Sequence, residues 1–275
     1  MVNTDPIIQF DDELTLVRAM EANLLETLDY LLANWDKTTF ERTPQLLWSI
    51  TDTQFTLFNS IIGARLTDDT VDATIQSLIE RGKEKEVPIL WWLGIEDTPE
   101  NLGKKLLEHG FFTGNPTPGM AMKMSDITWT ELPENLTIVP VRTAEQAQIW
   151  SDLVVESNQM AGYNEELAET LISGGLDASA KMQHIIGLID DEPVATASVT
   201  LSNGVAGVFN IAVLPDMRQQ GIGRIMTETV MKIGTEQGYH YAVLQSSPMG
   251  EALYQKMGYE TIAPVHQYIW LPSEQ

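Results

Sequence analysis

The sequence contains no cysteine, and it has only 16 lysine and arginine residues against 39 aspartate and glutamate residues, for a formal net charge of −23. Without cysteine there is no disulfide, no thiolate metal ligand and no cysteine nucleophile. The negative charge repels phosphate backbones and anionic lipid, so we expect neither nucleic acid nor a membrane surface as a partner. The apolar share of 43% is that of an ordinary globular protein.

Several other features are missing. No apolar run is long enough to span a membrane, and residues 1–14 have neither the basic start nor the apolar stretch of a secretory signal. We therefore expect a soluble cytoplasmic protein. The four histidines show no metal-ligand spacing, so we expect no metal site. The absence of a Gly-x-Ser-x-Gly elbow argues against a hydrolase.

A polar stretch with Pro133, residues 126–135, separates two segments of similar charge. The composition predicts a linker there, between a domain at residues 1–125 and a second at 136–275. In the first, the pattern predicts a helix over 14–32 and strand-like sequence over 54–65. It then predicts a helix over 70–85 capped by Asp68 or Asp69, a strand over 87–93 and a short helix over 99–108.

The second segment is richer in predicted strands. After a strand at 136–141 we expect a helix at 144–156, capped by Thr143, and another at 165–172. A three-stranded meander follows, at 184–189, 194–201 and 205–213. After it we expect a helix at 223–237, a strand at 241–245 and a last helix at 248–257. Both segments contain a run of helix, strand, proline turn, short helix and Gly-aromatic, with proline-to-glycine spacings of 11 (Pro99, Gly110) and 10 (Pro248, Gly258). This similarity indicates a tandem duplication.

One loop carries the chemistry. Residues 218–224 (RQQGIGR) follow an apolar strand and open an amphipathic helix. Glycines at 221 and 223 let successive N–H groups point into one concavity at the helix start, which favours a phosphate or diphosphate. Two of the six cations in residues 126–275, Arg218 and Arg224, flank this loop. The alternative is a tight turn with solvated arginines.

Other phosphate motifs are excluded. No Gly-Lys-Ser/Thr follows, as a P-loop requires. The dinucleotide fingerprint needs a small residue at position 226, which is methionine. The remaining pattern, Arg-x-x-Gly-x-Gly after the strand 211–215 (IAVLP), resembles the acyl-coenzyme A loop of the GNAT superfamily of N-acetyltransferases. Residues 251–259 (EALYQKMGY) are similar to the late helix of that family.

The resemblance implies an α/β (α+β) fold: two tandem GNAT-like domains, each a mixed, mostly antiparallel sheet flanked by helices, with a splayed strand pair (205–213 and 241–245) at the cofactor site. It implies an N-acetyltransferase that binds acetyl-CoA and transfers the acetyl group to a primary amine of a small molecule or peptide. A backbone N–H of Ala212 or Val213 would polarise the thioester, and Tyr254 would return a proton to the thiolate. The implied cofactor-binding residues are Ile211, Ala212, Val213, Arg218, Gln219, Gln220, Gly221, Ile222, Gly223, Arg224 and Ser247.

Three departures from the family pattern stand out. Phe209 and Asn210 occupy the place where many members carry a glutamate, so no carboxylate base is expected there. Ser247 replaces an asparagine that many members carry. Residues 246–250 either hydrogen-bond the cofactor or cap the last helix. The alternative for Tyr254 is a core tyrosine with a hydrogen-bonded hydroxyl.

The first segment resembles a degenerate copy. Leu106 stands where the tyrosine would be, and the sequence before the helix at 70–85 presents Asp68 and Asp69 in place of a glycine loop. We expect no coenzyme A there. Residues 156–181, with several glutamates, correspond to the acceptor-lining segment of the family and favour a cationic amine; a solvated acidic helix is the alternative. The alternative to an enzyme is a non-catalytic coenzyme A-binding regulatory module.

Overall fold

The computed structural model describes residues 12–160 and 162–272; most of the N-terminal stretch used in the secretory-signal argument lies outside them. The chain divides into two compact units. Unit 1 contains residues 1–27 and 118–263, and unit 2 contains residues 28–117 and 264–275. These boundaries differ from the expected division into 1–125 and 136–275. All three crossings between the units fall inside a helix or strand.

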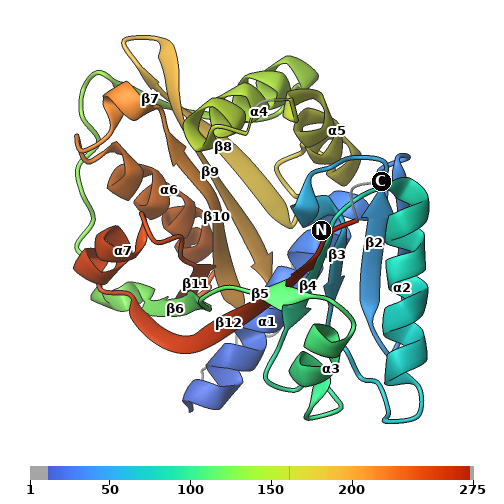
Figure 1. The fold of residues 1–275 in the computed structure, drawn as a ribbon. Coiled ribbons are helices and arrows are strands. Elements are labelled where there is room, and N and C mark those ends of the chain that lie inside the picture. Colours follow the sequence, from blue (N-terminus) through green and yellow to red (C-terminus); the bar gives the residue numbers. More distant parts are fainter. Residues whose placement is uncertain (1–11, 161, 273–275) are drawn as a thin grey trace. The chain divides into compact units, whose positions relative to one another are not determined.

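Unit 1 is built on a sheet in the order β6-β11-β10-β9-β8-β7 (Figure 1). Only the β10–β11 pair is parallel. The mixed, mostly antiparallel sheet flanked by helices confirms the predicted fold class. The strands are β6 (Thr117–Lys123), β7 (Leu136–Pro140), β8 (Met182–Ile189), β9 (Glu192–Ser202), β10 (Val205–Val213) and β11 (Tyr241–Gln245).

The helices that accompany this sheet follow the predicted pattern closely. Thr143 caps α4 as predicted, through a capping box in which its hydroxyl accepts from Gln146 N–H. The last helix begins three residues later than predicted. The helices are α4 (Ala144–Asn158), α5 (Asn164–Gly174), α6 (Ile222–Glu236) and α7 (Glu251–Met257), preceded by residues 13–27 of α1 (Glu13–Leu32).

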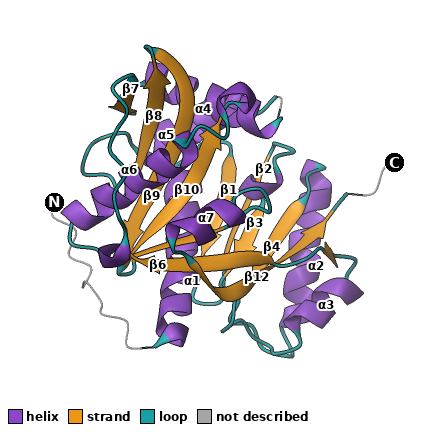
Figure 2. Cartoon of the chain, turned by 90° about the vertical axis from the view of Figure 1, so that its left-hand side faces the viewer, coloured by secondary structure: helices purple, strands orange, loops and turns teal. Residues whose placement is uncertain are grey.

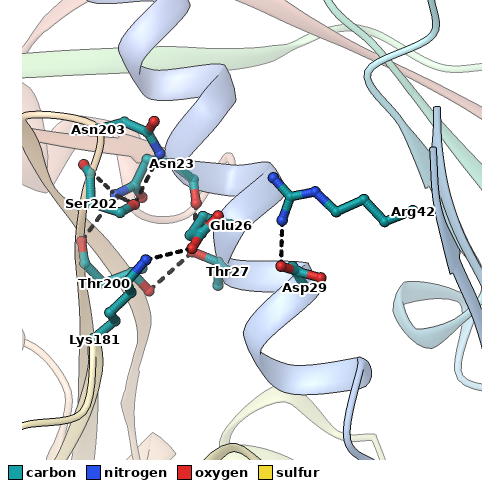
Figure 3. Close-up of polar contacts among 9 residues, drawn as sticks. All are labelled: Asn23, Glu26, Thr27, Asp29, Arg42, Lys181, Thr200, Ser202 and Asn203. Atoms are coloured by element: carbon teal, nitrogen blue, oxygen red, sulfur yellow. Dashed lines mark hydrogen bonds and ion pairs between the residues drawn. The ribbon is translucent and has the colours of Figure 1, made fainter. Parts of the chain in front are cut away.

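The long strand β9, labelled in Figure 2, carries a different kind of residue on each of its two faces. Its odd positions from Ala195 to Leu201 are apolar and pack in the same core as α6. Its even positions, Thr196, Ser198, Thr200 and Ser202, are buried hydroxyls on the opposite face. Two of these residues are hydrogen-bonded to α1: Asn23 Nδ2 donates to Thr200 O (3.0 Å) and to Ser202 Oγ (3.0 Å), as Figure 3 shows.

Unit 2 repeats part of this architecture. Its sheet runs β1-β2-β3-β4-β12, with a parallel β3–β4 pair and the short β5 attached to β12. Its strands are β1 (Thr38–Arg42), β2 (Leu47–Thr51), β3 (Ser60–Ile62), β4 (Ile89–Leu93), β5 (Phe112–Thr113) and residues 264–270 of β12 (Glu260–Trp270). Its helices are residues 28–32 of α1, α2 (Val71–Lys85) and α3 (Leu102–Glu108).

Several local predictions for this unit were wrong. The strand-like run 54–65 is a short 3₁₀ turn (Thr56–Phe58) followed by only three strand residues, and the β1–β2 hairpin was not predicted. Helix α2 is capped by Thr70 without a side-chain bond, so neither Asp68 nor Asp69 is the cap. The strands β6 and β12 were also missed. Across the described ranges, no helix is both long enough and apolar enough to cross a membrane.

Candidate active site

The parallel strands β10 and β11 separate part-way along their length. They pair only at Ala206–Ala242 and Gly207–Val243, although β10 continues to Val213. The separation coincides with a bulge, because the register of β10 against β9 shifts between Phe209 and Ala212. This arrangement matches the splayed pair that the family resemblance implied.

Asn210 is the residue that produces the bulge. Its φ of 52° lies in the left-handed region, where asparagine is one of the few tolerated side chains. Its carbonyl oxygen accepts the Thr196 hydroxyl at 2.8 Å, which holds the distorted backbone against β9. The sequence analysis considers Asn210 only because it stands where many members of the family carry a glutamate. A non-glycine residue that favours positive φ, inside a predicted strand, was the available signal.

The bulge determines which backbone groups face the opening. Leu214 N–H donates to Val194 O (3.0 Å), so Leu214 and Val194 form a hydrogen-bonded pair of the β9–β10 ladder. Because such pairs alternate in an antiparallel ladder, Val213 has its N–H and C=O directed away from β9, towards the side where β10 is unpaired. Ala212, which directly opposes Thr196, has its N–H directed towards β9.

Among the described residues, the loop after β10 has a run of backbone amides without hydrogen-bond partners. Gln219 has a φ of 63° and Gly221 a φ of 83°, and α6 begins at the next residue. The backbone N–H groups of residues 219–223 donate no hydrogen bond to any of the residues that the structure describes. A Cβ at Gly221 would meet no atom within 4 Å, so the space beside this residue is open. Open space and several unpartnered N–H groups at a helix start fit a diphosphate.

Both arginines beside this loop donate hydrogen bonds to other groups of the protein. Arg218 donates from Nε to Val213 O (3.0 Å) and from Nη2 to Ser157 O (2.6 Å). Arg224 donates from Nε to Glu228 Oε1 at 2.6 Å, and that buried carboxylate also accepts Thr130 N–H at 2.6 Å. The segment 126–135, which we expected to be a linker, is therefore hydrogen-bonded to α6 within unit 1.

Tyr254 on α7 lies close to the start of α6. The preceding residue, Leu253, is 3.5 Å from where a Cβ at Gly223 would lie. The Tyr254 ring is buried and packs edge-on against Tyr259, with ring centroids 5.6 Å apart. Burial raises the pKa of its hydroxyl to about 12, and a hydrogen bond to the Thr227 side chain opposes that shift. Tyr254 is therefore a neutral O–H donor at physiological pH.

Ser247 has a structural partner. Its Oγ accepts Gly250 N–H at 3.2 Å, and its carbonyl accepts Glu251 N–H at 3.1 Å, so it stabilises the turn that opens α7. Gly250 has no room for a side chain, because a Cβ there would lie 2.8 Å from the Tyr254 ring. The helix-cap alternative for residues 246–250 thus has direct contacts in its favour.

His184 belongs to a buried polar cluster that the sequence analysis did not identify. Its Nδ1 lies 2.7 Å from Ser198 Oγ, its ring packs edge-on against Trp150, and desolvation lowers its pKa to about 3. The register places Ser198 opposite both His184 and Phe209, so the cluster lies one strand away from the position of the missing carboxylate. Its burial and low pKa make His184 a poor base for an incoming amine. In the described ranges no three metal-ligating side chains come together.

Unit 2 also has a parallel strand pair followed by a helix, but its two strands do not separate. Beyond the parallel β3–β4 pair, Thr98 N–H donates to Ala64 O (3.0 Å) and Leu66 N–H to Thr98 O (3.2 Å), so this segment remains joined where β10 and β11 separate. At the start of α2, Asp72 accepts Lys105 Nζ at 2.7 Å and lies 3.0 Å from His109 Nε2. These two contacts hold the pKa of Asp72 below its usual value.

Comparison with known proteins agrees with this geometry. The model of the Acetyltransferase (GNAT) family matches residues 146–259. Residues 146–259 form a GNAT-family domain. A Bacillus subtilis (strain 168) protein described as an acetyltransferase is 29% identical over 79 residues, which is 29% of this chain and 54% of the relative. The matched part of this chain therefore spans about half the length of that curated relative.

Solved structures of the GNAT fold resemble the whole chain. A GCN5-related N-acetyltransferase from Kribbella flavida gives a TM-score of 0.66 at 18% identity, covering 94% of this chain and 96% of the other. A tandem GNAT protein from the clavulanic acid biosynthesis pathway gives a TM-score of 0.62 at 11% identity, covering 96% and 97%. At these identities the likeness shows the fold alone. It confirms the predicted tandem GNAT architecture.

Proposed function

We propose that this chain is an acetyl-CoA-dependent N-acetyltransferase whose donor site lies in unit 1. The observation that carries the proposal is the combination of a separated β10–β11 pair with unpartnered amides beside open space at the start of α6. In this proposal the N–H groups of residues 219–223 hold the diphosphate of acetyl-CoA, and the unpaired edge of Ile211–Val213 holds its pantetheine arm.

The thioester of acetyl-CoA supplies an activated acetyl group. Val213 N–H, which faces the unpaired side of β10, donates to the carbonyl oxygen as negative charge develops there. The amine nitrogen forms a bond to the acetyl carbon and the carbon–sulfur bond breaks. The Tyr254 hydroxyl gives its proton to the departing sulfur and regains one from water.

The proton of the attacking amine needs another acceptor. Phe209 is half-buried and carries no base, while the Asn210 side chain is exposed and neutral. We assign this proton to solvent water. A lysine-like amine has a pKa of about 10, so the rate of transfer rises with pH as the neutral amine becomes available.

The acceptor in this proposal is a primary amine, attracted by the acidic character of the chain. The alternative, a coenzyme A-binding module without turnover, is favoured by one observation: no carboxylate occupies position 209. We further propose that unit 2 has no donor site, because Asp72 already occupies the helix start and the Ala64–Thr98 bonds close the strand opening.

The test is thiol release from acetyl-CoA across a panel of amines, together with calorimetric titration of acetyl-CoA. The Gly221→Ala variant is expected to weaken binding at least about tenfold, because an alanine at a φ of 83° is strained and turns the loop amides away from the diphosphate. Gly110→Ala is the matched control, because Gly110 has a φ of 87°, equally open surroundings and a place in unit 2.

Three results separate the possibilities. Binding with thiol release supports the enzyme, and binding without release for any amine supports the non-catalytic module. If wild-type protein shows no heat with acetyl-CoA, or if Gly221→Ala binds as well as Gly110→Ala, the donor site is not where we place it.

A further inference from the structure

Arg218 makes contacts that a phosphate ligand would not need. Its guanidinium connects the last carbonyl of β10, at Val213, to the carbonyl of Ser157 in the last turn of α4. Both acceptors belong to the main chain, and the two bonds leave from different nitrogens of one planar group. The fork geometry of arginine suits such a bridge, whereas a lysine ammonium is a point charge on a flexible stem.

The Ser157 carbonyl is one of the last four of α4, which have no partner within the helix. A cation at this end also interacts favourably with the helix dipole. The helix ends at Asn158, the next residue, and after it Gln159 takes a φ of 56° and donates to Glu156 O, while Met160 N–H donates to Val155 O. Arg218 therefore stabilises the point at which α4 ends and the chain turns towards α5.

Both arginines beside the donor loop already have hydrogen-bond partners within the protein. Arg224 is paired with the buried Glu228, and Arg218 is directed at two carbonyl oxygens. Breaking the Arg224–Glu228 pair would leave a carboxylate buried and uncompensated, which is costly. The amides of residues 219–223 remain as the groups available to an anion.

We propose that Arg218 is a positioning residue that couples the donor loop to the end of α4, and that it is not a ligand of the diphosphate. This inference rests on the proposed function, since it assumes that acetyl-CoA occupies the loop. When the loop amides bind the donor, Arg218 is held in place, and through Ser157 O it holds the end of α4. Donor binding thereby stabilises the end of α4 at Gln159 and Met160, within the segment that corresponds to the acceptor-lining part of the family.

The first measurement is hydrogen exchange at the amides of Gln159 and Met160, with and without saturating acetyl-CoA. We expect acetyl-CoA to slow exchange at both amides in the wild-type protein. In Arg218→Gln at saturating acetyl-CoA, that protection is expected to be lost. Lys232→Gln is the matched control, because it removes one positive charge from an exposed site on α6, and it is expected to behave as the wild type does.

The second measurement is the affinity for acetyl-CoA at low and high salt. If Arg218 contacted the diphosphate, Arg218→Gln would lose at least about tenfold in affinity at low salt, the loss would shrink in high salt, and Arg218→Lys would restore much of it. We expect a loss of less than about fivefold, the same salt dependence as in the wild type, and no rescue of the Gln159 and Met160 protection by Arg218→Lys.

The outcomes are distinct from those that test the proposed function. No binding of acetyl-CoA to wild-type protein contradicts the donor site itself. Binding without protection of Gln159 and Met160, or full rescue by Arg218→Lys, contradicts the role of Arg218 while leaving the donor site intact. Thermal unfolding of each variant establishes that it is folded before either measurement.

Discussion

At the scale of single residues, the site depends on groups whose environment sets their chemistry. Burial raises the pKa of the Tyr254 hydroxyl to about 12, and Asn210 supplies a positive φ that no β-branched residue would accept. Both residues are visible in the sequence. Their properties come from packing that the sequence alone does not specify.

Replacing Tyr254 with phenylalanine removes the proposed proton donor and keeps the ring contact with Tyr259. We expect kcat to fall about 10²-fold with little change in the affinity for acetyl-CoA, since general acid catalysis of this kind contributes 10²-fold or more. Tyr259→Phe is the control, because Tyr259 is also buried but donates its hydroxyl to Met231 Sδ (3.3 Å). Equal losses in both variants would assign Tyr254 to the core rather than to catalysis.

His184 predicts how stability depends on pH. Its pKa is about 3 in the folded state and about 6.5 in an unfolded chain, so below pH 6.5 protons bind preferentially to the unfolded state. The contribution of His184 is therefore complete above pH 6.5 and is lost as the pH falls towards 3. Between pH 6.5 and 5 we expect the free energy of unfolding to drop by up to about 2 kcal/mol from this group.

Urea unfolding of the wild type and of His184→Gln at several pH values measures that contribution. The variant is expected to show a flatter pH dependence over this interval, whereas His240→Gln, at an exposed histidine of the same unit, is expected to follow the wild type. Parallel curves for wild type and His184→Gln would show that His184 is not the responsible group.

At the scale of elements, the two final strands are exchanged between the halves of the sequence. The strand β6, which ends the N-terminal half, pairs with β11 in unit 1. The strand β12, which ends the C-terminal half, pairs through residues 266–270 with β4 in unit 2. The expected boundary at residues 126–135 missed this exchange, because a polar stretch indicates a loop but does not specify which sheet the adjacent strand joins.

The helix α1 is hydrogen-bonded to the β9–β10 hairpin mainly through the side chain of Asn23, with one further bond from Thr27 to Thr200. Four oxygens lie within 3.4 Å of Asn23 Nδ2 and share its two hydrogens: Thr200 O, Ser202 O, Ser202 Oγ and Val205 O. Figure 3 shows Asn23 with Thr200 and Ser202. Gly207 permits this approach, since a Cβ there would overlap Asn23 Oδ1. Asn23→Ala leaves several buried oxygens unpartnered, so we expect a loss of about 2–4 kcal/mol in the free energy of unfolding.

Glu26→Gln, one turn along the same helix, is the comparison for that loss. It weakens an ion pair with Lys181 (2.7 Å) whose side chains are partly exposed, and such pairs contribute less than about 1 kcal/mol. Denaturant unfolding of the two variants measures both values. If Asn23→Ala costs no more than Glu26→Gln, the hairpin does not depend on α1.

At the scale of the whole molecule, two units of related architecture are expected to differ in function. Only unit 1 combines a bulged, separated strand pair with an open loop before its helix. We therefore expect calorimetry to give one acetyl-CoA bound per chain, and none measurable in Gly221→Ala at concentrations near the wild-type Kd. A second site with separate heat would contradict the inactive role that we assign to unit 2.

The sequence alone determined the family resemblance, the order of elements in the C-terminal half and the donor loop, because these depend on local chemistry: glycine spacing, helix caps and period-two apolar patterns. Residue type thus led to the loop at 218–224 and to Tyr254. Tertiary structure decided which groups within that loop are available. Charge predicts Arg218 and Arg224 as cofactor-binding residues, whereas their hydrogen-bond partners Ser157 O and Glu228 are set by contacts made only on folding. The exchange of β6 and β12 was likewise decided by pairing between strands distant in the chain, which no local pattern records.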